Sequence, residues 1–267
     1  PIPLVATAHY IYDLKLMTYA ARMAGNKTDE TKYSTLYNKV VEAFNREFYK
    51  PDSCCYGTGS QTSNALPLFL GITGENKEKV LQSLIADIEK HGNRLTTGDV
   101  GNRYLFMALA LNNKDELLYK MLNHYETPGY GFQIKQGATT LTEQWDPRQG
   151  SSWNHLMMGQ IDEWFFKRLA GIQNMPGTNG MRHLLISPTL VGDMTSVKGS
   201  TTTLYGKVEV TFNDKGLYAK IPVGCDAEIV IGSSFRMKVG SGEHYFFFKK
   251  SGDTTSIFKM VDNKKKK

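Results

Sequence analysis

The sequence contains very little cysteine. Among its 267 residues there are only 3 cysteines, and two of them, Cys54 and Cys55, are adjacent. Such a set does not form a disulfide framework, and no spacing of cysteine and histidine is typical of a zinc site. We therefore expect no metal and no organic cofactor. The cellular compartment stays open, because cysteine usage favours neither a cytoplasmic nor a periplasmic or secreted protein.

Long hydrophobic runs are also missing. The longest, such as residues 104–111, are far shorter than the ~20 residues with which a helix crosses a bilayer, so no membrane span is expected. No signal peptide is recognisable at the start of the sequence. Because the first residue is Pro1 rather than methionine, we expect the natural N-terminus to be processed or missing.

The excess of positive charge is confined to one end of the chain. The formal net charge is +6, but the four lysines at 264–267 account for most of it, and the rest of the sequence carries only +2. A terminal lysine run is usually a solvated tail. No basic stripe interleaved with aromatic residues is present, so nucleic acid is not an expected partner.

What the sequence does contain is a 40% share of hydrophobic residues, enough for a packed core, arranged with two different periods. Before residue 175 the spacing of apolar residues is helical, and after it apolar and polar residues alternate. We therefore predict a helical domain at residues 1–174 and a β domain at residues 175–267, with a glycine-rich linker at 171–180. About seven helices are expected, at residues 9–23, 28–49, 62–70, 77–90, 100–111, 114–124 and 152–170.

The β domain is predicted to be an antiparallel sandwich. A hairpin turn at residues 213–216 and several Gly-Ser turns separate short alternating segments, which is typical of that architecture. The strands are expected at residues 207–212, 217–223, 227–231, 235–239 and 244–248.

A long segment without helical pattern, residues 124–152, holds the residues best suited to chemistry. Glu143, Trp145 and Asp146 occur within four positions of one another. A carboxylate can activate water or stabilise an oxocarbenium-like centre, and an indole face can stack on a sugar ring. The structural alternative is that Glu143 and Asp146 cap the following turn while Trp145 fills the core beneath it.

His155 is expected in the first turn of the last predicted helix. The positive end of the helix dipole favours a neutral imidazole there, which suits sugar hydroxyls. The alternative is a histidine bonded to a nearby backbone carbonyl. Asp99 precedes another predicted helix and is interpreted as its cap, because the surrounding residues 96–101 lack the Gly-Lys-Ser/Thr ending of a phosphate-binding loop.

These residues together resemble the signature of bacterial α-L-rhamnosidases. The similar segments are residues 136–146 (QGATTLTEQWD), 152–155 (SWNH), 3–10 (PLVATAHY) and 97–101 (TGDVG). The resemblance implies an (α/α)6-barrel catalytic domain followed by a C-terminal β-sandwich. It also implies hydrolysis of terminal α-L-rhamnosides with inversion, and hence a rhamnose-containing glycoside or polysaccharide as substrate.

The resemblance further implies roles for individual residues. The family's Ser-Trp-Gly-Tyr-like turn is replaced here by residues 127–131, so that Tyr130 or Phe132 takes the place of a sugar-facing aromatic. The implied assignments are Glu143 as general base, Trp145 as a wall of the sugar subsite, His155 as a partner of a sugar hydroxyl, and Asp146 and Tyr130 as further substrate contacts.

The family's general acid and most of its acidic sugar contacts lie on an earlier segment that this sequence does not include. We therefore expect the chain to correspond to about half of a barrel plus the sandwich, and to be a poor catalyst by itself because general acid assistance contributes about 10²–10⁴-fold. Helix faces left exposed would be covered by self-association or by the missing N-terminal part.

Three alternatives remain open. The first is another (α/α)6 glycosidase with a different sugar specificity. The second is a non-catalytic carbohydrate-binding module, in which Trp145 and Tyr130 stack on glycans and Glu143 only donates or accepts hydrogen bonds. The third and weakest is a nucleic-acid binder that acts through the lysine tail and fails when residues 264–267 are deleted.

Overall fold

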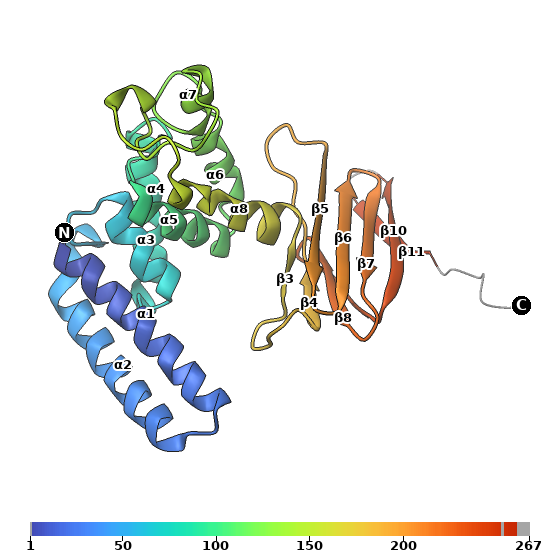
Figure 1. Ribbon diagram of the computed structural model, residues 1–267, viewed down its shortest axis with the longest axis horizontal. Coiled ribbons are helices and arrows are strands. Elements are labelled where there is room, and N and C mark those ends of the chain that lie inside the picture. Colours follow the sequence, from blue (N-terminus) through green and yellow to red (C-terminus); the bar gives the residue numbers. More distant parts are fainter. Residues whose placement is uncertain (1, 252–253, 261–267) are drawn as a thin grey trace, which may run out of the picture. The chain divides into compact units, whose positions relative to one another are not determined.

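The structure is a computed structural model that describes residues 2–251 and 254–260 (Figure 1). The chain forms two compact units, Pro1–Gln160 and Ile161–Lys267. The predicted order of a helical domain followed by an antiparallel sandwich is confirmed. The two units divide between Gln160 and Ile161, whereas the boundary was predicted after residue 174, which is the last residue of strand β3 (Ile172–Asn174) in the second unit. The lysine tail, residues 264–267, lies outside the described residues.

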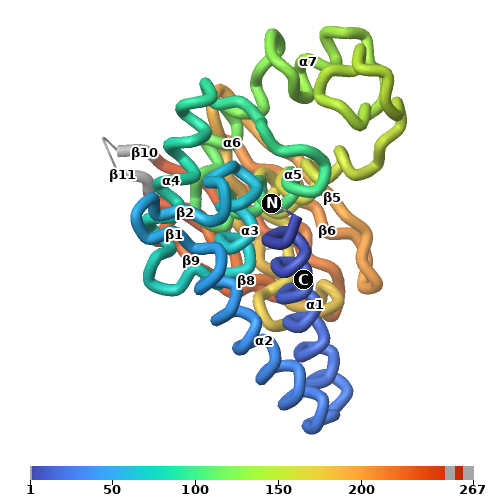
Figure 2. The backbone as a smooth tube through the Cα atoms, turned by 90° about the vertical axis from the view of Figure 1, so that its left-hand side faces the viewer, coloured from blue at the N-terminus to red at the C-terminus, as the bar shows by residue number. Residues whose placement is uncertain are grey.

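The first unit is built from consecutive helices that pack as antiparallel hairpins. Helices α1 and α2 run side by side (Figure 2), α3 packs on α4, and α3 also packs closely on α5. The turn between α1 and α2 contains Gly25 with a φ of 71°, and the Asn26 side chain caps α2 by accepting the Asp29 N–H. The helices are α1 (Ile2–Met23), α2 (Lys27–Phe48), α3 (Gln61–Leu70), α4 (Lys77–Lys90), α5 (Asp99–Leu111), α6 (Asp115–Leu122) and α7 (Tyr130–Lys135).

A two-stranded ribbon joins α2 to α3 in this unit. Strands β1 (Tyr49–Lys50) and β2 (Cys55–Tyr56) pair around the short 3₁₀ helix η1 (Pro51–Ser53). Tyr56 is buried, and its hydroxyl donates to Asn45 Oδ1 at 2.5 Å. Burial raises the pKa of Tyr56 far above its ordinary value, which keeps this phenol protonated and available as a donor.

The predicted helix at residues 152–170 is wrong in its first half. Residues 151–155 are not helical, and the helical turns that follow are short. His155 is therefore not in the first turn of a helix. The physical reason is tertiary: the backbone of residues 152–155 bonds to residues 140–143 instead of to its own next turn. The turns are η4 (Leu156–Gln160, 3₁₀), α8 (Ile161–Trp164) and η5 (Phe165–Leu169, a π-helix).

Helix α7 lies where no helix was expected. It follows Gly129, and its second residue is Gly131, where a Cβ atom would come within 2.4 Å of the His124 carbonyl oxygen. This close backbone approach requires glycine and places α7 beside residue 124. The loops before and after α7 gather at one end of the helical unit (Figure 1).

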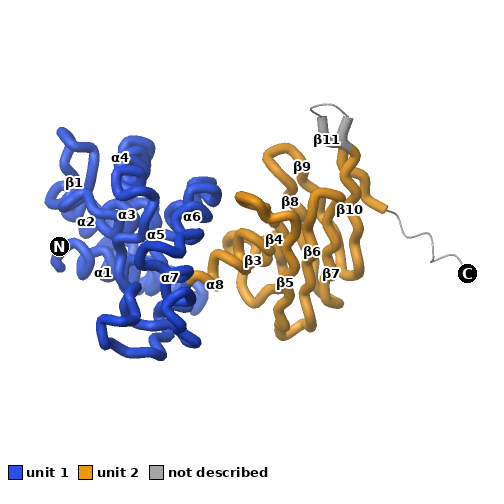
Figure 3. Tube along the Cα trace, turned by 90° about the horizontal axis from the view of Figure 1, so that it is seen from above, with its two compact units in different colours: residues 1–160 blue, residues 161–267 orange. Residues whose placement is uncertain are grey.

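The second unit is a sandwich of two sheets (Figure 3). One sheet has the strand order β11-β10-β7-β6-β5, and the other has the order β3-β4-β8-β9, in which β4 and β8 are the parallel pair. The strands are β3 (Ile172–Asn174), β4 (His183–Ile186), β5 (Ser196–Thr203), β6 (Gly206–Asn213), β7 (Gly216–Ile221), β8 (Asp226–Ile231), β9 (Phe235–Val239), β10 (Gly242–Ser251) and β11 (Thr254–Lys259).

Apolar side chains from both sheets form the core of the sandwich. Val208, Val210, Ile186 and Ile229 are fully buried, and the partly buried Phe248 and Ile257 pack against this cluster. The alternation along each strand places one face in this core and the other in solvent. The five expected strands are present as β6 to β10. Strands β3, β4, β5 and β11 were not predicted, and β3 lies within the predicted linker.

Candidate active site

Two segments of the long loop region pair with each other and present Glu143. The Glu143 N–H donates to the Ser152 carbonyl at 2.9 Å, and the His155 N–H donates to the Leu141 carbonyl at 2.8 Å. The Thr140 hydroxyl adds a bond to the Trp153 carbonyl. The carboxylate of Glu143 accepts the Ser152 N–H through Oε2 at 3.2 Å. Glu143 is half-buried, and within the described ranges no cation forms an ion pair with it.

A buried amide holds the loop on both sides of Glu143. Gln133 lies on α7 with 3% of its surface exposed. Its Nε2 donates to the carbonyls of Thr142 at 3.2 Å and Gln144 at 3.0 Å, the two residues that flank Glu143. The buried Thr142 hydroxyl also donates to the Gln144 carbonyl at 2.8 Å. Sequence reasoning missed Gln133, because its helix was not predicted and a single glutamine carries no motif.

Trp145 and Tyr130 meet and anchor their polar ends in the protein. The Trp145 indole N–H donates to the Thr97 carbonyl at 2.7 Å, and its ring lies edge-on to Tyr130 at 4.9 Å between centroids. The Tyr130 hydroxyl donates to the Met158 carbonyl at 2.6 Å and accepts from Asn102 Nδ2 at 3.2 Å. Both side chains are half-buried, and their polar ends are bonded to the protein.

His155 faces a carboxylate rather than a helix terminus. Its Nε2 lies 3.3 Å from Oδ2 of Asp99, and both side chains are partly exposed. The interpretation of Asp99 as the helix cap is wrong, because Gly98 occupies the N-cap of α5. Asp99 is the first residue of the helix, and its Oδ1 accepts the Val100 N–H at 2.8 Å. One Asp99 oxygen thus bonds to the backbone of the next residue, while the other contacts His155.

Asp146 is engaged by Arg148. Its two oxygens accept from Nε of Arg148 at 2.8 Å and from a terminal guanidinium nitrogen at 2.7 Å, and Oδ1 also caps the short helix η3 (Pro147–Gln149). These hydrogen bonds hold the pKa of Asp146 below its usual range and raise the pKa of Arg148. The guanidinium lies over the Phe132 ring at 5.3 Å. Asp146 therefore fixes the turn that follows Trp145.

Two concavities lie beside these residues. One, of about 240 Å³, runs along Tyr130, Gln133 and residues 138–141. The other, of about 510 Å³, is lined by Asp99 and Thr62 together with residues of α1. None of the predicted site residues lines the larger cavity, and its link to them is Asp99, which contacts His155.

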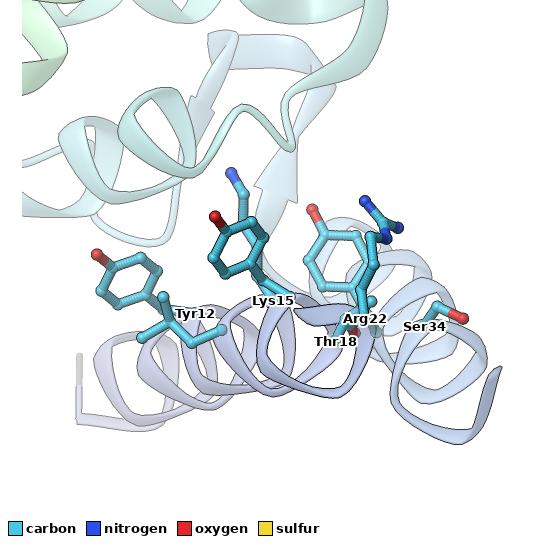
Figure 4. A pocket seen from close by; sticks show the side chains of 8 residues that line it. Tyr12, Lys15, Thr18, Arg22 and Ser34 are labelled. Carbon is cyan, nitrogen blue, oxygen red and sulfur yellow. The ribbon is translucent and has the colours of Figure 1, made fainter. Parts of the chain in front are cut away.

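A third concavity lies on the α1–α2 hairpin. It measures about 400 Å³ and is lined by apolar side-chain surface together with Lys15 and Arg22 (Figure 4). None of the predicted site residues lines it. Over residues 2–251 and 254–260, no group of three or more His, Cys, Asp or Glu side chains is placed to hold a metal ion. In the same ranges, no helix has the length and hydrophobicity of a membrane span.

A unit of helical hairpins followed by a β-sandwich is the arrangement of two domains that occur together in one protein family. Residues 1–169 match the model of the bacterial alpha-L-rhamnosidase six-hairpin glycosidase domain, and residues 171–246 match that of the bacterial alpha-L-rhamnosidase C-terminal domain. The chain therefore belongs to the bacterial α-L-rhamnosidase family, as the resemblance of residues 136–155 predicted.

Individual relatives agree with this assignment. An alpha-L-rhamnosidase of Formosa agariphila is 32% identical over 242 residues, which are 85% of this chain and 26% of that protein. One of Streptomyces avermitilis is 28% identical over 280 residues, covering 92% of this chain and 27% of that protein. The chain thus spans about a quarter of the length of the curated relatives it matches.

Solved structures show the same fold. The alpha-L-rhamnosidase from Dictyoglumus thermophilum superposes with a TM-score of 0.85 and 30% identity, covering 91% of this chain and 31% of that one. The Streptomyces avermitilis enzyme, solved in complex with L-rhamnose, gives a TM-score of 0.83 at 24% identity, covering 91% of this chain and 26% of that one.

Proposed function

We propose that this chain supplies the general base and part of the sugar subsite for inverting hydrolysis of terminal α-L-rhamnosides. The observation that carries the proposal is the setting of Glu143. Its backbone is held on both flanks by Gln133, its carboxylate is partly exposed, and within the described part of the chain no cation pairs with it. A carboxylate held this way is ready to accept a proton from water.

The reaction follows from two carboxyl groups on opposite sides of the sugar. Glu143 removes a proton from a water molecule, whose oxygen bonds to the anomeric carbon while the bond to the leaving oxygen breaks. A carboxylic acid on the other side gives its proton to the leaving oxygen. The two carboxyl groups of inverting enzymes are about 6.5–9.5 Å apart, which leaves room for that water.

The neighbouring residues are proposed to hold the ring. The faces of Trp145 and Tyr130 offer apolar surface for the C–H side of the sugar. His155, with Asp99 beside it, is placed to exchange hydrogen bonds with sugar hydroxyls. Asp146 could contact the sugar only through lone pairs that its ion pair with Arg148 does not use. Its main proposed role is therefore to position the turn that follows Trp145.

The general acid is proposed to come from outside these 267 residues. This is supported by the share of about a quarter that the chain has of its relatives' length. On this basis we expect little or no turnover from the chain alone. The apolar groove on the α1–α2 hairpin is then proposed to be covered by further helices or by a second copy.

Glu143→Gln tests the base assignment. The substitution keeps the shape and the bond from the Ser152 N–H but removes the basic oxygen. In a form of the protein that hydrolyses an aryl α-L-rhamnoside, we expect kcat to fall by about 10²–10⁴-fold, the usual share of general base catalysis. The matched control is Glu89→Gln, which removes an exposed carboxylate of α4 outside the candidate site and should retain turnover.

The outcome also separates the alternatives. NMR of the first product formed should show the β anomer, as inversion requires. Unchanged turnover in Glu143→Gln, or an α product, would overturn the proposal. If no form of the protein hydrolyses the substrate while Glu143→Gln binds rhamnose as well as the parent chain does, a non-catalytic carbohydrate-binding module is the correct function.

A further inference from the structure

One face of the sandwich carries large aromatic side chains that the core does not use. Along β10 the side chain of Phe246 points inward and is 1% exposed, whereas its neighbours Tyr245 and Phe247 point outward and are 40% and 45% exposed. Phe258 on the adjacent strand β11 is 55% exposed. Such a concentration of exposed aromatic surface on one sheet face indicates a binding surface.

The strand register makes these side chains contiguous. Tyr245 lies directly opposite Tyr218 on β7, with ring centroids 5.0 Å apart, and Phe247 lies directly opposite Phe258 on β11. Since directly opposed residues share a face, the four rings cover three neighbouring strands. We call Tyr218, Tyr245, Phe247 and Phe258 the aromatic face.

A groove of about 180 Å³ opens at the edge of this face. Phe247 is opposed on its other side by Gly216, which offers no side chain to cover the ring. A Cβ atom at Gly216 would lie 2.1 Å from the Phe246 carbonyl oxygen, so the close strand approach keeps this position empty. Asn213 and Lys215 line the groove, and Asn213 Oδ1 accepts the N–H groups of Lys215 and Gly216.

The charges around the aromatic face are unbalanced. On the strands themselves, Glu209 pairs with Lys207 at 2.7 Å and Glu243 lies 3.8 Å from Lys220. Two further exposed lysines, Lys215 in the groove and Lys249 beyond Phe247, have no carboxylate partner in residues 2–251 and 254–260. Asp214 is exposed in the same turn as Lys215 and offsets part of that charge. The surface therefore complements a ligand with apolar ring faces and negative charge.

We propose that the aromatic face binds an acidic glycan. Pyranose rings stack by their C–H faces on Tyr245 and Phe247, and their carboxylates bind Lys215 and Lys249. The Tyr245 hydroxyl donates to Glu243 Oε2 at 3.1 Å and Asn213 Oδ1 accepts two backbone N–H groups, so the Asn213 Nδ2 group and the Tyr218 hydroxyl are the groups that supply hydrogen bonds to ring hydroxyls. The extended strand surface can accommodate several units of a polymer. Carboxylates that repeat along such a polymer can reach both Lys215 and Lys249, which lie on either side of Phe247. This site is independent of the hydrolytic site at Glu143.

The test uses the whole chain and polygalacturonate as the probe. Affinity electrophoresis should show retardation by polygalacturonate and much weaker retardation by its carboxyl-reduced, neutral counterpart. Removing two aromatic contacts in the Tyr245→Ala, Phe247→Ala variant should weaken binding by roughly fivefold or more, since both stacking surfaces are lost. The Lys215→Gln, Lys249→Gln variant should weaken binding and reduce its dependence on salt.

Matched controls remove the same side chains elsewhere in this unit. Lys238→Gln on β9 and Tyr205→Ala in the turn between β5 and β6 change exposed residues outside the aromatic face, and should leave binding unchanged. Circular dichroism of every variant checks that the sandwich is intact.

Several results would overturn the proposal. These are no retardation by polygalacturonate, equal retardation by the neutral polymer, or equal binding of a single-stranded oligonucleotide, which would make the face a general polyanion surface. A dimer in gel filtration that Tyr245→Ala, Phe247→Ala dissociates would make it an interface between copies. Because no readout depends on hydrolysis, a failure here leaves the role of Glu143 untouched, and a failure of Glu143→Gln leaves this site untouched.

Discussion

The helical hairpins and the loop region after residue 122 satisfy their backbones in different ways. In α4, the N–H and C=O groups bond within the helix, and what holds the helix in place is apolar burial of Leu84 and Ile88. In residues 138–155 the backbone bonds to side chains and to distant backbone, as in the contacts of Gln133 with Thr142 and Gln144. A hairpin thus depends on its apolar residues, whereas the candidate site depends on single polar donors.

The largest effect is expected from an apolar deletion in the hairpins. Leu84→Ala removes a fully buried side chain from α4 and should lower the free energy of unfolding of the helical unit by about 2–5 kcal/mol. Urea unfolding followed by circular dichroism at 222 nm measures it. Gln82→Ala, at an exposed position of the same helix, is the control and should change stability little. If Leu84→Ala lowers the free energy of unfolding by no more than Gln82→Ala does, α4 does not depend on the burial of Leu84.

A polar deletion should affect the loop more locally. Gln133→Leu keeps the volume but removes the Gln133 donor from both carbonyls, which leaves Gln144 with the Thr142 hydroxyl as its donor and costs about 1–3 kcal/mol. Hydrogen exchange of the peptide covering residues 140–147 should speed up, while exchange in α4 stays as it was. Gln149→Leu, which changes an exposed glutamine of η3, serves as the control. Equal protection of residues 140–147 in both variants would show that Gln133 does not hold the loop.

Acid should loosen the loop before it loosens the hairpins. The bonds from Arg148 lower the pKa of Asp146 below that of an unfolded chain, about 3.9. Its stabilising contribution is therefore complete above that value and is lost as pH falls through the lowered folded pKa. The pKa of Glu30 in the α1–α2 hairpin is also lowered, by Arg22 and then Lys27, but the helix bonds there do not involve that carboxylate.

Hydrogen exchange at decreasing pH, corrected for intrinsic rates, distinguishes the two regions. Peptides around η3 should lose protection below about pH 4, where unfolded aspartate titrates, before peptides of α1 and α2 do. In Asp146→Asn this acid step should be absent, because the neutral amide does not titrate. Simultaneous loss in both regions would mean that the Asp146–Arg148 pair does not control the loop.

This difference also explains how much the sequence could predict. The bounds of α4 are those expected from its apolar period, because helix start, helix end and buried face are all local features. The start of α1 was placed too late, at residue 9 instead of Ile2, since residues 2–8 carry no capping signal. In the sandwich, strong alternation identified β6 and β7, but β5 is polar and packs through Gly199 against Ala170, which alternation does not reveal.

The candidate site was predicted by residue type more than by geometry. Glu143, Trp145 and His155 lie in connected loop segments and Tyr130 begins α7, yet His155 was placed on a helix that does not form. Its position depends on a bond from its N–H to the Leu141 carbonyl, across a separation that no local pattern encodes. The contact of His155 with Asp99 and the bonds from Gln133 to the loop also join residues far apart in the sequence. They therefore could not be predicted from local sequence patterns.

The placement of Gln133 on a different segment from the loop it supports has a consequence for protein engineering. A designer who transplants residues 138–147 alone into another scaffold would move the carboxylate without the amide that shapes its surroundings. The smallest transferable module is α7 together with both paired segments, residues 130–155, and it would still need a replacement for the Thr97 carbonyl that anchors the indole.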